Sequence, residues 1–349
     1  MKRVMLALSI ISCFLTSPSI SNAKSWLLVG GNYYQMADIG SEKELTSKVY
    51  DYMMSDNFTE IENLAKDIRD NDGRFPEGVH KQMYLTEVAK RYGKNEEGFV
   101  AYFDKLHKWS EQFPGSSTER LFEAKAWNDY AWFARGDGFA DIVTEKGWKL
   151  FDERIKKAYE IASIEPESKT DDYQERYILL QTIARAQSWD RERYDRLFQE
   201  AIALDPHYYR FYCERAFYLL PRWYGSPEEW KEFAINALVN VPEKDRPELY
   251  TRIVWSIFNA REFQDMGEIS WPLMRQGVQD IMARYPGSRW NLNNFAAFAL
   301  RAQDWGTAFE LIALIGDDPY IEVWGSRKSY NEFRYVATQA QDRKKSKPE

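Results

Sequence analysis

Apolar residues recur every three or four positions along most of the chain, which is the spacing of one face of an α-helix. An early helix shows this spacing at Leu45, Val49, Tyr52 and Met53. Further helices are predicted over residues 57–69, 76–92 and 96–112. No long stretch alternates apolar and polar residues with the period of two that marks a half-buried strand. The pattern therefore predicts an all-α protein.

The predicted helices end in a recurring way. A proline follows the last apolar turn at Pro114, Pro166, Pro206, Pro242, Pro286 and Pro319, at intervals of 33 to 52 residues. Proline stops a helix because it has no N–H to donate and restricts the residue before it. Irregular intervals of about 40 residues are typical of helix-pair repeats with insertions.

One of these helix endings is similar to the end of a tetratricopeptide repeat. Ala201 to Pro206 closes a helix there, and Tyr208 and Tyr209 start the next unit. The usual Trp, Leu-Gly and Tyr positions of the first helix are not regularly filled. The predicted fold is therefore a tetratricopeptide-like helical-repeat solenoid, a right-handed superhelix of antiparallel helix pairs.

The most distinctive turn runs from Pro221 to Trp230. Pro221 ends an aromatic helix, and Ser226 is placed to accept a hydrogen bond from the first turn of the next one. Pro227 suits the first helical position, and Glu229 stands three residues after Ser226, as in a capping box. This spacing predicts a helix that starts at Ser226.

The N-terminus has the pattern of a secretory signal peptide. Lys2 and Arg3 precede an apolar run over residues 4–15, which is too short to span a bilayer. Small residues at Ser21 and Ala23 predict cleavage after Ala23 and a mature protein in the periplasm or outside the cell. An alternative is a lipid anchor at Cys13. It is less favoured, because apolar residues rather than a polar tether follow Cys13.

The mature chain is expected to have four parts. Residues 24–40 form a leader, 41–115 an N-terminal helical region, 116–338 the repeats and 339–349 a disordered tail. The chain has 349 residues, of which 44% are hydrophobic, and this is ample for a sizeable core. Outside the signal peptide no apolar run predicts a transmembrane helix.

The charge narrows the choice of partners. The net charge of −7 becomes −9 when the signal peptide removes two basic residues. Nucleic-acid binding needs a basic surface, and here the basic residues are scattered among acidic ones at helical spacing. A protein or peptide is therefore the expected partner, and nucleic acid is not.

The sequence gives little sign of catalytic chemistry. The three histidines, at His80, His107 and His207, do not have metal-ligand spacing, and Cys213 is the single cysteine left after cleavage. There is no Gly-x-Ser-x-Gly elbow and no phosphate-binding loop. We therefore predict no cofactor, no metal and no enzymatic activity.

Paired carboxylates are the one catalytic pattern that remains. Asp137, Asp141 and Glu145 lie on a long connection after an aromatic helix. Glycoside hydrolysis needs only two such acids across a groove. A carboxylate-dependent envelope hydrolase is therefore an alternative hypothesis.

Two blocks of this sequence resemble a bacterial family that carries a domain of unknown function. The first runs from Trp132 to Ala140, with the family's Ala-Arg-Gly-x-Gly pattern, and continues over residues 143–151. The second runs from Leu219 to Ser226, with its Leu-Pro-Arg-Trp-x-Gly-Ser pattern. The resemblance covers roughly residues 57–238. It implies an architecture and no mechanism, because the family has no established activity.

The leading hypothesis is a non-enzymatic binding or scaffold protein that holds a protein, peptide or envelope component on a concave aromatic surface. Arginine offers paired hydrogen bonds to carboxylates, and aromatic rings offer flat contact area. An immunity protein against a periplasmic toxin is a further alternative, suggested by the acidic charge. The candidate binding residues are Trp132, Arg135, Arg222, Trp223 and Tyr224, followed by Tyr208, Tyr209 and Arg210.

Overall fold

The computed structural model describes residues 36–136, 140–167, 173–260 and 265–345. All regular elements in these ranges are helices, and an isolated bridge between Arg74 and His80 is the one β feature among them. The prediction of an all-α protein is confirmed. No described helix has both the length and the apolar character needed to cross a membrane. The predicted signal peptide and Cys13 lie outside the described residues.

The helices fall into two compact units. The first unit is Met36–Ile257, and the described part of the second lies within Phe258–Glu349. In chain order, with η for 3-10 helices, the first unit contains α2 (Ile39–Met54), α3 (Phe58–Asp70), α4 (Gln82–Leu85), η2 (Thr86–Val88), α5 (Ala89–Tyr92), α6 (Glu96–Gln112), α7 (Ser117–Arg135), η3 (Ala140–Ile142), α8 (Glu145–Ala162), α9 (Gln174–Ala186), α10 (Arg191–Leu204), α11 (Arg210–Tyr218), α12 (Glu229–Asn236), η5 (Ala237–Asn240), η6 (Glu243–Asp245) and most of α13 (Arg246–Asn259).

Side-chain caps and prolines set many of the helix bounds. The side chain of Asn95 accepts from Gly98 N at the start of α6, and Ser116 accepts from Glu119 N at the start of α7. These caps satisfy backbone donors that have no partner within the helix. Each of the six prolines predicted to follow a helix lies shortly beyond a helix end. The predicted helix over residues 96–112 is confirmed as α6.

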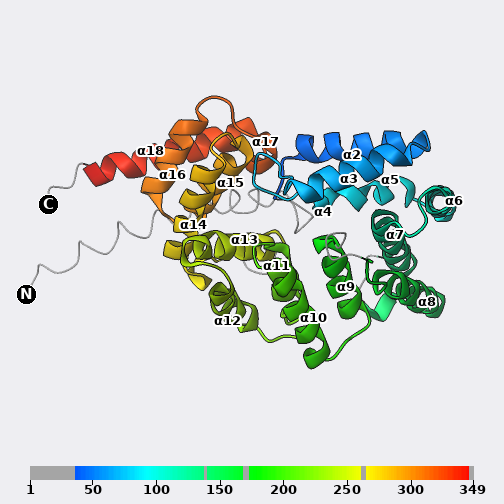
Figure 1. Cartoon of the computed structure of the whole chain (residues 1–349). Coiled ribbons are helices and arrows are strands. Elements are labelled where there is room, and N and C mark those ends of the chain that lie inside the picture. Colours follow the sequence, from blue (N-terminus) through cyan, green and yellow to red (C-terminus); the bar gives the residue numbers. More distant parts are fainter. Residues whose placement is uncertain (1–35, 137–139, 168–172, 261–264, 346–349) are drawn as a thin grey trace, which may run out of the picture. The chain divides into compact units, whose positions relative to one another are not determined.

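Helices that follow one another in the first unit pack together. α7 packs on α8, α9 on α10 and α11 on α12, and α9 also contacts both α7 and α11 (Figure 1). The core between them is rich in rings. Tyr102, Trp109, Tyr194 and Tyr212 are all completely buried. Large rings bury much area for each residue, and this suits helices that depend on their neighbours for stability.

The helix predicted over residues 76–92 is broken. Residues 74–80 form a turn that the Arg74–His80 bridge closes, and the short helices α4, η2 and α5 follow it. All four residues of α4 are buried. Apolar spacing predicts a helix when one face is buried and the other is in solvent. Here α4 is buried on all sides, so the spacing of its apolar residues does not indicate one continuous helix.

The second unit contains η7 (Met266–Glu268), α14 (Trp271–Arg284), α15 (Arg289–Arg301), α16 (Trp305–Ile315), α17 (Ile321–Trp324) and α18 (Arg327–Lys345). α16 packs between α15 and α18. α18 reaches into residues expected to form a disordered tail, since residues 339–345 are helical. Ala337 is still buried in this last helix, and its packing holds the turns around it.

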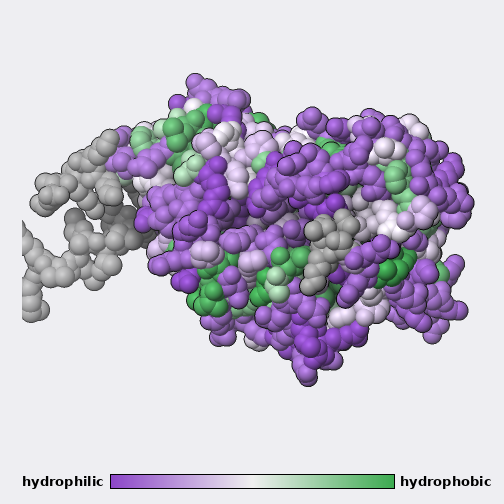
Figure 2. Space-filling model, in the orientation of Figure 1, coloured by the Kyte–Doolittle hydropathy of each residue, from purple (hydrophilic) through white to green (hydrophobic). Residues whose placement is uncertain are grey.

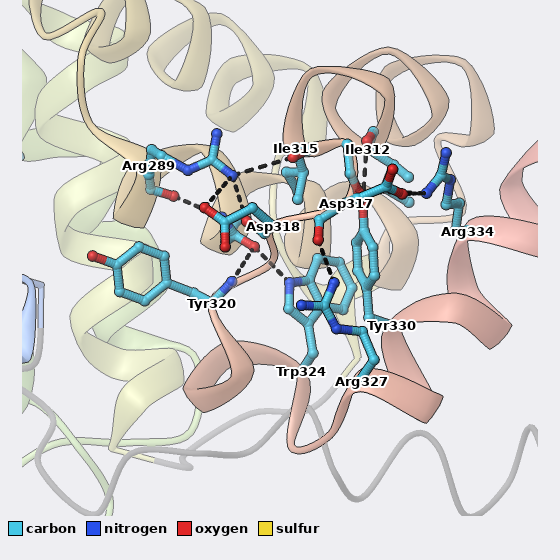
Figure 3. Close-up of polar contacts among 12 residues, drawn as sticks. Arg289, Ile312, Ile315, Asp317, Asp318, Tyr320, Trp324, Arg327, Tyr330 and Arg334 are labelled. Carbon is cyan, nitrogen blue, oxygen red and sulfur yellow. Dashed lines mark hydrogen bonds and ion pairs between the residues drawn. The ribbon is translucent and has the colours of Figure 1, made fainter.

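Polar side chains close the end of α16 in the second unit. Arg289 donates to Ile315 O over 3.1 Å, and the Tyr330 hydroxyl donates to Gly316 O over 2.7 Å (Figure 3). Arg334 pairs with Asp317 over 2.6 Å. Cationic and hydroxyl donors at this position satisfy the last carbonyls of the helix and its dipole. The cluster thus has a structural role.

Candidate functional site

The second family-like block forms the turn between α11 and α12. Trp223 N donates to Leu220 O over 2.9 Å, and Tyr224 N donates to Tyr218 O over 3.2 Å. Gly225 lies so close to the backbone of Leu219 that a Cβ would meet Leu219 O at 1.8 Å. The turn therefore requires glycine at this position.

The helix after this turn starts later than predicted. α12 begins at Glu229, and its N-cap is Glu228, with no side-chain cap. The glutamate half of the predicted capping box is present, because Glu229 Oε2 accepts from Ser226 N over 3.1 Å. Glu229 also pairs with Arg191 at the start of α10. This ion pair holds the first turn of α12 against the neighbouring helix pair.

Two arginines lie on the Phe217 ring of α11. The guanidinium carbons of Arg185 and Arg222 are each 4.7 Å from its centroid. Arg185 is buried, lies 5.2 Å from the Trp223 ring and donates to Glu214 Oε2 over 2.9 Å. Arg222 is exposed, and Trp223 is half-buried. Of the two arginines on this ring, Arg222 is therefore the one that solvent reaches.

Tyr224 fastens the turn to α9 and α10. Its hydroxyl donates to Arg185 O over 2.8 Å, and its carbonyl accepts from Arg191 Nη2 over 2.9 Å. Its ring stacks on Tyr218, with 4.9 Å between centroids. These contacts stabilise the turn and leave little of Tyr224 for a partner.

Arg135 lies between two tryptophans at the end of α7. Its guanidinium carbon is 5.4 Å from the Trp132 ring centroid and 5.3 Å from that of Trp148, at the start of α8. The two family-like blocks thus belong to different helix pairs, the first to α7–α8 and the second to α11–α12. Among the carboxylates of the hydrolase hypothesis, Asp137 lies outside the described residues, and Asp141 and Glu145 are exposed.

The three weaker candidates lie in the interior. Tyr208, Tyr209 and Arg210 are all at least nine-tenths buried. Arg210 forms a buried ion pair with Glu175, which also accepts from the Tyr208 hydroxyl. Glu175 thus satisfies both Tyr208 and Arg210 from within the fold.

Residues 73–92, which we call the inserted segment, pack against Tyr208 and Tyr209. The His80 ring lies 4.2 Å from Tyr208 and 5.5 Å from Tyr209, between centroids. Farther along the segment, Glu87 pairs with Lys125 of α7 over 3.6 Å. The inserted segment therefore packs on α7 and on the start of α11, where the three weaker candidate residues lie.

His80 is held in its neutral form. Its Nδ1 lies 3.1 Å from Asp72 Oδ1, and its ring is almost completely buried. Burial lowers the pKa of His80, and the Asp72 carboxylate opposes that shift without cancelling it. Nδ1 therefore carries the hydrogen that bonds to Asp72. The pair orients the inserted segment, and its ring contacts are with Tyr208 and Tyr209.

A different surface presents rings to solvent. Phe103 of α6 packs 4.4 Å from Trp127 of α7, and Tyr130 lies 5.9 Å from Phe103 and 6.5 Å from Phe133, between centroids. Trp127 and Tyr130 are half-buried, and 39% of Phe133 is exposed. We call Phe103, Trp127, Tyr130 and Phe133, with the neighbouring Val100, the aromatic face.

The aromatic face stands out from its surroundings. Val100 is 56% exposed, which adds an aliphatic side chain beside the rings. On the side of the molecule drawn in Figure 2 most of the surface is hydrophilic, and hydrophobic residues emerge in small patches. A group of large apolar side chains left at the surface of a helix pair is typical of an interaction site.

The sequence carries a local signal for this face. Trp127, Tyr130 and Phe133 are three residues apart and share one side of α7. Such spacing shows that the rings lie together, but it does not show whether another helix covers them. Whether the rings are buried depends on which helices pack against α7 in the folded protein.

A small pocket lies elsewhere in the first unit, between α7, α8 and α9. Its walls include Leu121, Ala124, Ile161 and Leu179, and its volume is about 20 Å³. That volume holds a water molecule, whereas sites for drug-sized ligands take several hundred Å³. The pocket gives no support to a small-molecule site.

Comparisons with family models, curated proteins and solved structures found no match for this chain. The resemblance of the two blocks to a family with a domain of unknown function stays a prediction. Of the surfaces described above, the aromatic face has the most exposed large apolar side chains in one place.

Proposed function

We propose that this protein is a non-enzymatic binding or scaffold protein of the bacterial envelope, periplasmic or secreted, which holds a protein or peptide on the aromatic face. The observation that carries the proposal is the row of rings from Phe103 to Phe133 at the surface of α6 and α7. Clustered Trp, Tyr and Phe side chains dominate binding energy at protein interfaces, because each buries a large area at a small entropic cost.

The proposal includes a tetratricopeptide-like, right-handed solenoid in the first unit. It is supported by the helix pairs α7–α8, α9–α10 and α11–α12, whose first helices contact one another in turn. Such an array holds a surface rigidly, because each pair is fixed by its neighbours. α7 belongs to this array, so neighbouring helices would hold its aromatic rings in fixed positions.

The proposed surface differs from the concave one expected from the sequence. In a solenoid of this kind the first helices line the inner side, and here the inserted segment lies on α7 and α11 and covers Tyr208 and Tyr209. A partner would need to displace twenty residues of the chain to reach them. The aromatic face requires no such rearrangement.

The test is a pull-down from envelope extract with the purified mature protein. We expect a partner, identified by mass spectrometry, that is lost with the double variant Trp127→Ala/Phe133→Ala. The control is Tyr335→Ala, which removes a ring that is 65% exposed on α18. This variant should keep the partner, and circular dichroism should be the same for all three proteins.

Two results would count against this function. One is a partner that the double variant retains in full. The other is hydrolysis of cell-wall glycan by the wild type that disappears with Asp141→Asn, because that outcome would move the function to the carboxylates of the loop.

A further inference from the structure

The aromatic face has an acidic border. Glu97, Asp104 and Glu111 are exposed and recur every seven residues along α6. Seven residues make almost two helical turns, so the three carboxylates form one line along the helix. Val100 and Phe103 lie on the adjacent side of the same helix. A line of negative charge thus runs parallel to the rings.

The lysines of α6 do not neutralise this border. Lys105 and Lys108 both pair with Asp56, over 2.7 Å and 3.3 Å, at the turn between α2 and α3. They are therefore held toward a different part of the first unit. Glu96, where the row of rings ends, already pairs with Arg154 of α8, and His107 lies 3.5 Å from Glu111 at the far end of the line.

The face already holds one guanidinium of its own. Arg154 of α8 lies 3.2 Å from the centroid of the Tyr130 ring and pairs with Glu96 over 3.3 Å. Its Nη1 also donates to Tyr130 O over 3.0 Å. The Arg154 cation thus contacts the flat side of an aromatic ring and a carboxylate at the same time. Further aromatic rings and carboxylates lie along α6 and α7.

From these observations we infer that the aromatic face binds a basic peptide segment, whose arginine or lysine side chains stack on Trp127 and Phe133 and pair with the acidic line of α6. Cations are attracted to the faces of aromatic rings, and Trp is the strongest partner. The acidic line selects positive charge and repels acidic segments. This inference deepens the proposed function and rests on it.

The experiment uses a short acetylated and amidated peptide of alternating arginine and alanine, labelled for fluorescence anisotropy. A second peptide has citrulline in place of arginine, which keeps the shape and removes the charge. We expect the arginine peptide to bind the wild type about tenfold more tightly than the citrulline peptide, which is the size of effect that a few cation–π contacts and ion pairs produce.

Variants separate the rings from the charge. Trp127→Ala/Phe133→Ala keeps every charge and should weaken binding of the arginine peptide by about tenfold, as expected for lost ring contacts. Asp104→Asn keeps every ring and should weaken binding less, with a smaller dependence on salt. Tyr335→Ala should bind like the wild type.

Two outcomes overturn the inference. If the double variant binds the arginine peptide as well as the wild type does, the attraction comes from net charge and not from this face. If the citrulline peptide binds equally well, the face selects no cation. If a pull-down partner still depends on Trp127 and Phe133, the proposed function stands without the preference for basic peptides. If the pull-down also shows no dependence on these rings, the proposed function is contradicted as well.

Discussion

Glu119 shows how the placement of one residue changes its chemistry. It is the third residue of α7, and only 5% of it is exposed. Burial raises its pKa from 4.5 to about 8, and the nearby Glu123 adds to the shift. The folded state therefore holds a proton on Glu119 over a pH range in which the unfolded chain has released it.

The sign of the resulting pH dependence follows from this shift. A group whose pKa is raised by folding stabilises the folded state fully below its unfolded pKa, and that contribution is lost as the pH rises through the folded value. For Glu119 the loss extends from about pH 4.5 to about pH 8. Above that range the folded state carries a buried charge.

We predict that Glu119→Gln stabilises the protein at pH 8 and leaves its stability unchanged near pH 4. Glutamine has the same shape and no charge, so the gain at pH 8 should be on the order of 3 kcal/mol, since a tenfold change in proton affinity corresponds to about 1.4 kcal/mol. Urea unfolding across this pH range measures it. Glu97→Gln, at an exposed position, should have little effect, and an equal gain at both pH values would contradict the prediction.

Two arginines of similar local sequence have opposite environments in the fold. Arg210 and Arg222 are both charged and both lie near rings in the sequence, yet one is buried in an ion pair with Glu175 and the other is exposed. The buried pair joins two helices, with Glu175 at the start of α9. For Arg210 that partner is 35 residues away in the chain, beyond the reach of local spacing.

At the scale of elements, local chemistry determined where many helices stop. The prolines and side-chain caps act within a few residues of a helix end, so the sequence placed the ends of α6, α10 and α14 well. The start of α12 was predicted too early: the helix begins at Glu229 after an uncapped Glu228, and only the glutamate half of the capping box is formed.

The turn between α11 and α12 leads to a prediction about Gly225. Replacing it with alanine forces a Cβ against the backbone of Leu219, where the distance would be 1.8 Å. We expect Gly225→Ala to lower the free energy of unfolding by about 1–3 kcal/mol, the usual cost of overpacking. The matched control is Gly287→Ala, since a Cβ there meets nothing within 4 Å. Denaturant midpoints compare the two, and equal midpoints would contradict the prediction.

At the scale of the whole molecule, the compartment decides which partners the protein can meet. The charged start, the short apolar run and Ala23 predict a mature chain that begins at Lys24. The intact mass of protein isolated from the envelope of an expressing bacterium would show this. A diacylated product that starts at Cys13, and that disappears with Cys13→Ser, would instead favour the lipid anchor.

The sequence by itself determined that the protein is helical and where many of its helices end, because helical periodicity, capping and proline act over a few residues. It also brought Trp127, Tyr130 and Phe133 to one side of a helix. Only the tertiary structure decided that these rings stay at the surface while Tyr208 and Tyr209 lie beneath the inserted segment. Burial of a ring depends on contacts with residues that are far apart in the chain, and the spacing of nearby residues does not determine those contacts.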